Sequence, residues 1–268
     1  MTDRLRSPWW QAGVLAVLGA IRMAWQPDER LCMSMIAGAC IGLAAAIVAG
    51  AGIAAAGARA WWLLQRVRQA ITATTFVPTP PPVSEAMRRT GVTRVRCVDA
   101  ATRLAFCAGA IRPTVYLGPA LVDALGTDAL DAVLVHESEH ARRRDPLRRA
   151  IQRAIADVFF CVPVAAWWHR RSIEDSELAA DRAAIGAVGA AAVAEALWSA
   201  APEHSAANTE LLPAFDGSEQ ARVAQLLGDD LPSRRPSAMA LLVSFGVLSL
   251  LVSLAMCVGQ ELVRSVIN

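Results

Sequence analysis

The sequence has 268 residues, of which 55% are hydrophobic and only 19% are charged. This composition is too apolar for an ordinary soluble domain of that length, so we expect a membrane protein. The formal net charge is +2, and every basic residue is an arginine. Without a lysine-rich tail or a dense basic face, we expect no direct partnership with nucleic acid.

Three apolar segments are predicted to cross a lipid bilayer. Residues 31–58 carry no charge and would span about 40 Å as a helix, more than the roughly 30 Å of a hydrocarbon core. The segment 8–25 is shorter than this one and contains Arg22. Tryptophans lie at both of its ends, and tryptophan is enriched at the interfaces of a membrane with water. A cleaved signal peptide is the alternative for this segment, although no small-x-small cleavage site follows it. The third predicted span is residues 236–260.

The arginines predict which side of the membrane each segment faces. They flank the ends that we place in the cytoplasm: Arg4, Arg6, Arg59, Arg66, Arg68, Arg234 and Arg235. Because positively charged flanks stay inside, residues 78–235 are predicted as a cytoplasm-facing domain of a multi-pass protein of the cell (inner or plasma) membrane. Residues 1–68 form the N-terminal membrane region. There, Gly38 and Gly42 make a GxxxG face, a candidate contact for a homodimer through the membrane helices.

The central region begins with a predicted tether and a small β-sheet. The proline-rich stretch 79–83 predicts an extended segment without helix. Three β-prone pieces follow between Val92 and Leu117, and they read VTRVRCV, RLAFCAG and TVYLG. Glycine and proline break them, so we expect a small sheet or a set of hairpins.

Two helices are predicted after the sheet. Thr127 or Asp128 is the expected cap of a helix through DALDAVLVHESEHARRR. Asp145 followed by Pro146 resembles a cap with proline at the first helical position. The second helix should therefore start immediately after the first one ends.

The first of these helices carries an HExxH motif, formed by His136, Glu137 and His140. Residues four apart share one face of a helix, so both imidazoles can bind one Zn²⁺ ion. Glu137 is then placed to act on the water bound to the metal. The motif predicts a zinc site with Glu137 as the catalytic residue.

A catalytic zinc ion needs a third protein ligand and one open position. Within IEDSELAADRAAI, residues 173–185, Glu177 and Asp181 lie four apart on one helical face. Glu177 is the candidate third ligand, and Asp181 can orient a ligand histidine from behind. The alternative is a solvated acidic face that these two residues share with Glu174 and Asp175.

The apolar segment 154–168 is predicted as a helix that is buried in the domain or lies in the membrane interface. If it crossed the bilayer, Glu177 would emerge on the side opposite His136, and no shared site could form. Its short length and Pro163 permit the buried or interfacial placement.

Taken together, these motifs resemble the peptidase family of the β-lactam-sensing antirepressors (BlaR/MecR type), which are minimal zincins embedded in membranes. The resemblance covers about residues 108–185 and rests on AGAIRPTVYLGPALVDAL, AVLVHESEHARRRDPL, the apolar VPVAAWW and SELAADRAAI. It implies a mostly α membrane protein with a small α+β zincin-like catalytic domain. It also implies that His136, His140 and Glu177 bind zinc and that Glu137 is the general base.

The resemblance further implies that one strand offers an edge to an extended peptide, and we expect this strand at Thr114, Val115, Tyr116 and Leu117. Two departures from the family matter. We expect no large extracellular penicillin-binding domain after the last span, and the sequence has no lysine for an SxxK acylation site, so we expect no direct β-lactam sensing. Ala180 replaces the family's usual cysteine before the final aspartate.

The sequence thus predicts a membrane-bound zinc endopeptidase. By resemblance, its substrate is a cytoplasmic transcriptional repressor or another regulator, cleaved in response to an envelope signal. His204 is the candidate transition-state stabiliser, with Tyr116 and His169 as weaker candidates. Two alternatives remain open: an HtpX-like quality-control protease of the membrane, and a zincin-fold signalling subunit that acts mainly by binding.

Overall fold

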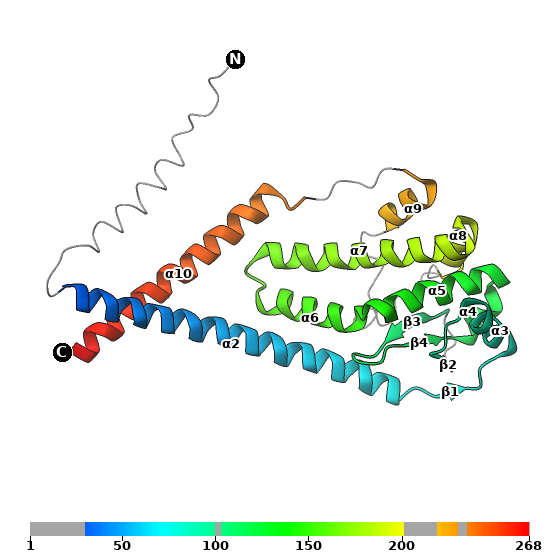
Figure 1. Cartoon of the computed structure of the whole chain (residues 1–268), viewed down its shortest axis with the longest axis horizontal. Helices are drawn as coiled ribbons and strands as arrows, with labels where there is room; N and C mark the ends of the chain where they lie inside the picture. Colours follow the sequence, from blue (N-terminus) through cyan, green and yellow to red (C-terminus); the bar gives the residue numbers. More distant parts are fainter. Residues whose placement is uncertain (1–29, 100–102, 201–218, 230–234, 268) are drawn as a thin grey trace, which may run out of the picture. The chain divides into compact units, whose positions relative to one another are not determined.

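The computed structural model describes residues 30–99, 103–200, 219–229 and 235–267. The first predicted span, 8–25, and His204 lie outside these residues. The chain divides into two compact units, which we describe separately. One is Gly52–Ser244, and the other comprises Met1–Ala51 and Phe245–Asn268. Figure 1 shows the elements in chain order.

Two long helices carry the apolar segments. Helix α2 runs from Arg30 to Thr72, and helix α10 runs from Ala238 to Ile267. Each contains a candidate membrane span, Ala45–Thr72 and Ala238–Gly259, and only 6% of an apolar 18-residue stretch in each span is buried by the protein itself. Helices of this length with exposed apolar side chains are typical of membrane-spanning segments. The structure therefore agrees with a membrane protein.

The Gly52–Ser244 unit contains a four-stranded mixed sheet, as the β-prone pieces predicted. Its strands are β1 (Phe76–Val77), β2 (Val95–Val98), β3 (Ala105–Ala108) and β4 (Thr114–Leu117). The order is β1-β2-β4-β3, with β4 parallel to β2 and antiparallel to β3. The prediction of Thr114–Leu117 as an edge strand was therefore wrong. Strand β4 pairs with β2 on one side and with β3 on the other, so it takes an inner position and β3 lies at the edge. Three of the four residues of β4, Val115, Tyr116 and Leu117, are buried.

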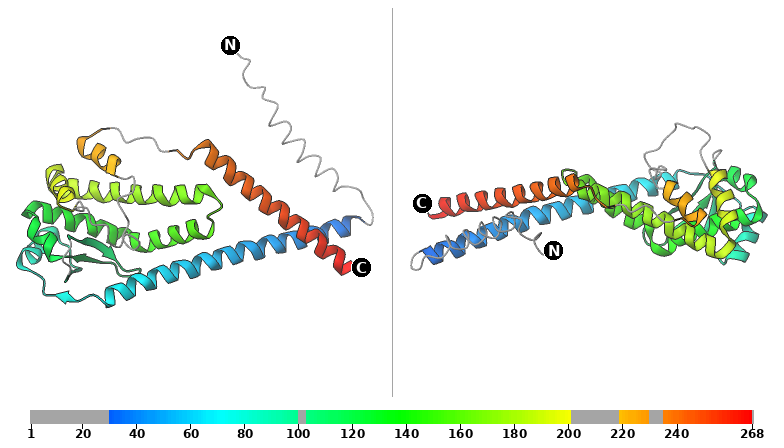
Figure 2. Two further views of the ribbon diagram at one scale, coloured as in Figure 1. Left: turned by 180° about the vertical axis from the view of Figure 1, so that it is seen from behind. Right: turned by 90° about the horizontal axis from the view of Figure 1, so that it is seen from above.

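Among the described residues of this unit, seven further helices accompany the sheet, and most of them pack around α5. They are α3 (Pro81–Thr90), α4 (Pro119–Ala124), α5 (Thr127–Arg143), α6 (Asp145–Val158), α7 (Pro163–Val188), α8 (Ala190–Ala200) and α9 (Glu219–Leu227). Helix α5 contacts α3, α6, α7, α8, β3 and β4, and it lies between the sheet and helices α7 and α8 (Figures 1 and 2). Its N-terminal half is buried on nearly all sides, which fixes the position of the HExxH motif that follows. The mostly α architecture with a small α+β domain is confirmed.

The local predictions for the starts of α3 and α5 were wrong. The stretch 79–83 is not free of helix, because α3 begins at Pro81 and places its prolines in the first turn, where no backbone N–H is required. The cap residue of α5 is Gly126, which has no side chain that could form a capping hydrogen bond. Instead, the backbone N–H of Gly126 donates to Glu195 Oε1 of α8 at 2.9 Å. A tertiary contact thus replaces the local cap expected at Thr127 or Asp128.

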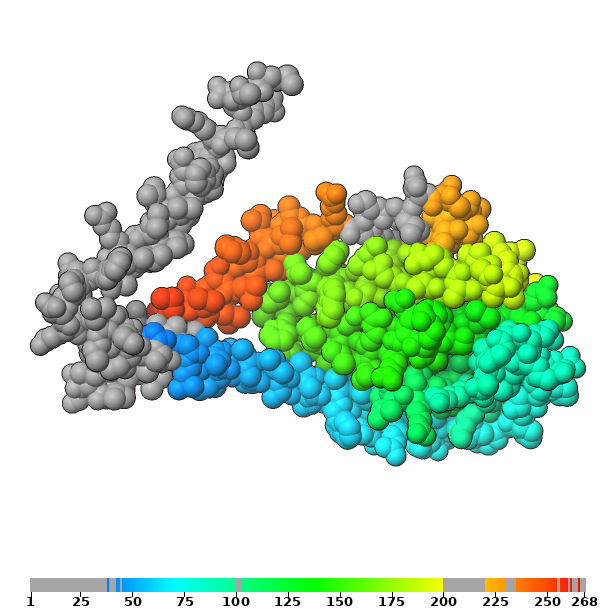
Figure 3. Space-filling view, viewed as in Figure 1, coloured from blue at the N-terminus to red at the C-terminus, as the bar shows by residue number. Residues whose placement is uncertain are grey.

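The apolar segment 154–168 is not one helix. Helix α6 ends at Val158, the chain reverses through residues 159–162, and α7 begins with Pro163 in its first turn. The two helices pack against each other as an antiparallel hairpin (Figure 1), and in the space-filling view α5, α6 and α7 form one continuous mass (Figure 3). This reversal brings the C-terminal half of α7 back to α5, as a shared site requires.

Candidate metal centre

Helix α5 places two imidazole nitrogens side by side. His136 and His140 lie one turn apart, with their rings nearly perpendicular and their centroids 4.8 Å apart. Their Nε2 atoms are separated by 3.1 Å. Both side chains are largely shielded from solvent, with 14% and 7% exposed.

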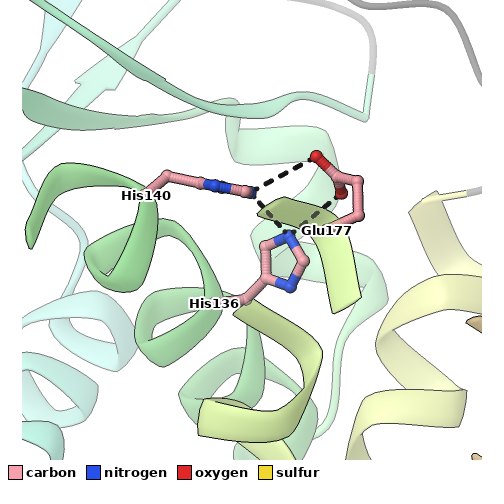
Figure 4. Close-up of side chains that lie close together, drawn as sticks. All are labelled: His136, His140 and Glu177. Atoms are coloured by element: carbon pink, nitrogen blue, oxygen red, sulfur yellow. Dashed lines mark hydrogen bonds and ion pairs between the residues drawn. The ribbon is translucent and has the colours of Figure 1, made fainter. Parts of the chain in front are cut away.

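Helix α7 adds a carboxylate opposite the two imidazoles. Glu177 Oε2 lies 3.5 Å from His136 Nε2, and Glu177 Oε1 lies 3.5 Å from His140 Nε2. Figure 4 shows the three side chains converging on one point. Glu174, Glu177 and Asp181 are all shielded inside the protein. Of the four acidic residues only Asp175 is exposed, so the alternative of a solvated acidic face that includes Glu177 and Asp181 was wrong.

Two further carboxylates hold the far nitrogens of the histidines. His136 Nδ1 lies 2.9 Å from Asp181 Oδ1, and His140 Nδ1 lies 2.8 Å from Asp145 Oδ2. Each Nδ1–H donates to its carboxylate, which leaves the Nε2 lone pairs directed at each other and at Glu177. Such a convergence of lone pairs is favourable only with a cation or a proton between them.

Asp145 is a site residue that the sequence analysis interpreted differently, as a helix cap. In the structure the cap of α6 is Arg144, which adopts a left-handed conformation with φ of 56°. This conformation turns the chain sharply between α5 and α6 and directs Asp145 back to His140. The close succession of the two helices was visible in the sequence, but the contact with the imidazole was not.

Two arginines also belong to the site, the buried Arg222 and the half-buried Arg149, and no sequence motif indicated them. Arg222 of α9 forms a bidentate pair with Asp181, with both N–O distances at 2.7 Å, and its Nη1 lies 3.4 Å from Glu177 Oε2. Arg149 of α6 donates from Nη2 to Glu177 Oε1 at 2.5 Å and to Ser176 Oγ at 2.7 Å. Both occur in ordinary polar segments, so only the fold reveals their role.

These contacts shift the pKa values of the site. Burial lowers the pKa of His136, but hydrogen bonds to Asp181 and Glu177 outweigh it and raise the pKa to about 9. Burial opposes the charge of Glu177, yet His136, Arg149 and His140 hold its pKa well below the usual value. For Asp181, His136 and Arg222 likewise overcome burial and lower the pKa. The site is therefore built to keep its carboxylates ionised next to a positive charge.

The three converging groups fit a metal ion. Zinc bound tetrahedrally at about 2.0–2.1 Å has ligand atoms about 3.3 Å apart, close to the separations of 3.1 and 3.5 Å found here. Two neutral imidazoles and one carboxylate also form a donor set that leaves a fourth position open. His136, His140 and Glu177 would hold the ion, and Asp181 and Asp145 would orient the two imidazoles.

Glu137 follows His136 on α5 and is close enough to Cys107 of β3 for its charge to act on that thiol. It is buried with 9% exposure, and its charge contributes to raising the pKa of both His136 and Cys107 of β3. Burial is the main reason that the pKa of Cys107 rises to about 12. The thiol is therefore protonated at neutral pH and does not compete as a nucleophile or a ligand.

The remaining candidates lie elsewhere. Tyr116 stacks on Phe106, with ring centroids 5.0 Å apart, and packs with Val67 and Ile71 in a small apolar cluster that shares no residue with the site. His169 is two turns of α7 before Glu177, about 12 Å along the helix. Burial lowers its pKa. Neither is placed among the converging groups.

Substituting Arg222 should weaken metal binding. The change Arg222→Gln leaves Asp181 without its bidentate partner, so His136 is held less firmly, and we expect the metal affinity to fall about 10- to 100-fold. Competition with a chromogenic chelator measures it. Arg182→Gln is the matched control, since Arg182 joins α7 to α9 through an exposed contact with Gln225. Equal affinities in the two variants would contradict the role of Arg222.

The metal-free protein should lose stability as pH rises towards 9. The folded-state pKa of His136 lies above its ordinary value of 6.5, so its contribution is complete below pH 6.5 and disappears through about pH 9. The shift corresponds to about 3 kcal/mol at most. Thermal melting in detergent after chelation should show the melting temperature falling across this window. The change should be absent in His136→Gln, and a flat wild-type profile would contradict the assignment.

The sequence matches the family model described as BlaR1 peptidase M56 over residues 33–193, more than half of the chain. No curated protein and no solved structure matches it. The matched region contains both α5 and α7, and with them His136, His140 and Glu177, whereas Arg222 lies beyond its end. The family assignment agrees with the converging donor set and with the resemblance found in the sequence. The chain is a member of the BlaR1 peptidase M56 family, and hence of a family of membrane-associated metallopeptidases.

Proposed function

We propose that this protein is a membrane-bound zinc endopeptidase. The observation that carries the proposal is the convergence of His136, His140 and Glu177, whose possible ligand atoms all lie within 4.8 Å of one another. When bound there, zinc polarises a scissile carbonyl and lowers the pKa of water. The two histidines and one carboxylate are the donor set of catalytic rather than structural zinc sites.

Glu137 is the proposed general base. Its carboxylate accepts a proton from the attacking water and later delivers that proton to the leaving amine. Its burial beside His136 restricts competing water around the carboxylate. His204 remains our proposal for the transition-state stabiliser, and it lies outside the described residues.

The substrate is proposed to bind as an added strand on β3. Among the described strands, β3 pairs only with β4, so the N–H and C=O groups on its other side are free of strand partners. An extended peptide can use these groups, which replaces the earlier expectation of Thr114–Leu117 as the edge. Because Cys107 of β3 is close enough to Glu137 to be affected by its charge, a peptide on this edge lies near the general base.

We further propose that the catalytic domain faces the cytoplasm of a multi-pass protein of the inner or plasma membrane. The arginines next to the span ends support this orientation. The substrate would then be a transcriptional repressor or another cytoplasmic regulator, cleaved in response to an envelope signal. A homodimer through the Gly38 and Gly42 face is proposed on the sequence pattern alone.

The change Glu137→Gln should abolish proteolysis and retain the metal. Loss of the general base is expected to lower kcat about 10²- to 10⁴-fold, while the ligands are untouched. We would measure metal content and compare the proteomes of cells that carry the wild type or the variant. Glu139→Gln is the matched control, because Glu139 pairs with Arg142 instead of joining the site.

The proteome comparison separates the remaining interpretations. One protein that is truncated only in wild-type cells supports regulatory cleavage. Many damaged proteins that accumulate in the variant would indicate an HtpX-like quality-control protease. Unchanged signalling and no change in any truncated protein would contradict catalysis and favour a subunit that acts by binding.

A further inference from the structure

The turn between α6 and α7 is exposed and apolar. Its residues are Phe159, Phe160, Cys161 and Val162, and Pro163 follows. The side chain of Phe160 is 80% exposed, and Cys161 is exposed as well. A turn at a water-facing surface normally carries polar residues, so this composition indicates a different environment.

The same turn contacts both helices that carry candidate spans. The ring of Phe159 lies against Gly52 of α2, so closely that a Cβ atom added there would be 3.0 Å from the ring. On the other side, the backbone N–H of Val164 donates to Ser244 Oγ of α10 at 3.1 Å. Gly52 and Ser244 both belong to the candidate spans Ala45–Thr72 and Ala238–Gly259.

Both contacts lie at a similar depth along their helices. Gly52 is two helical turns before Arg59, the first charge that follows it, which is about 10 Å. Ser244 is in the second turn of α10, about 9 Å from Ala238. Both points are therefore well inside uncharged segments. The contact with α2 and the contact with α10 therefore place the turn at a similar depth in the bilayer, each independently of the other.

Charged and aromatic side chains border the turn, from Asp157, two residues before it, to Arg153 and Trp168, about one to two helical turns away. Asp157 pairs with Arg59 and with Arg153, both at 2.8 Å. The guanidinium of Arg59 lies 4.5 Å from the ring centre of Trp62, and Trp168 is 40% exposed. Arginine and tryptophan are the residues that favour the headgroup level of a bilayer.

We propose that residues 159–163 insert into the lipid bilayer beside α2 and α10, with Arg59, Arg153 and Trp168 at the level of the headgroups. The occupant is lipid because the turn touches both span helices and is bordered by residues typical of the membrane interface. Glu177 lies about 21 Å from Pro163 along α7, so this anchor would hold the metal centre near the membrane surface. The proposal concerns anchoring and does not depend on catalysis.

Spin-label accessibility in liposomes tests this placement. The full chain, with its native cysteines replaced, would carry Phe160→Cys or Ile111→Cys in vesicles of phosphatidylethanolamine and phosphatidylglycerol. Ile111 is the matched control, since its side chain is also 80% exposed but lies in the turn between β3 and β4. We expect the label at 160 to collide several-fold more with oxygen than with a water-soluble nickel chelate, and the label at 111 to show the reverse.

Two outcomes of this experiment would overturn the proposal. Equal nickel accessibility at both positions would place the turn in water. Suppressed collisions with both oxygen and nickel at position 160 would show that protein, such as a second copy of the chain, covers it instead of lipid.

A second measurement uses a variant of the full chain in which every cysteine except Cys161 has been replaced. In liposomes, Phe160→Asp should raise the rate of Cys161 labelling by a charged maleimide at least about tenfold, because a carboxylate is strongly disfavoured in the hydrocarbon. Phe160→Leu should leave the rate unchanged. Labelling that is equally fast in the wild type and in Phe160→Asp would contradict insertion.

Discussion

The charge of the Glu177 carboxylate is the feature around which the catalytic unit is organised. Burial alone would favour the neutral acid, since an unpaired charge in a protein interior is costly. His136 of α5, Arg149 of α6 and Arg222 of α9 surround this carboxylate and stabilise its ionised form. Helices that are distant in sequence are thereby tied to α7 at one point. The same carboxylate would bind a metal ion together with the two histidines.

The α6–α7 hairpin satisfies the geometric requirement that this arrangement imposes. Glu177 can meet the histidines only if the chain reverses after α6, and it does so in four apolar residues followed by Pro163. The reversal exposes Phe160 at one end of the hairpin and aligns Glu177 with α5 at the other. A single supersecondary element would therefore serve both the site and the contact with lipid.

Much of this architecture could be predicted from local sequence patterns. The HExxH spacing, the ExxxD spacing and the β-prone pieces follow from helical and strand periods, so they gave His136, His140, Glu177 and the sheet. The edge position of β3 could not be predicted in this way, because strand order depends on which strands pair in the folded chain, and the local sequence of a strand does not specify its partners. Asp145, Arg149 and Arg222 were missed as site residues because their partners are set by tertiary packing. Their own neighbours in the sequence indicate only caps and polar surfaces.

X-ray absorption at the zinc K-edge, recorded on the purified full chain, tests the central claim most directly. We expect one zinc ion per chain, with a first shell of nitrogen and oxygen at about 2.0–2.1 Å and the outer scattering of two imidazoles. The imidazole signal should fall by about half in His140→Ala. A first shell with sulfur at about 2.3 Å, or a protein that binds zinc equally well after His136, His140 and Glu177 are all replaced, would contradict it.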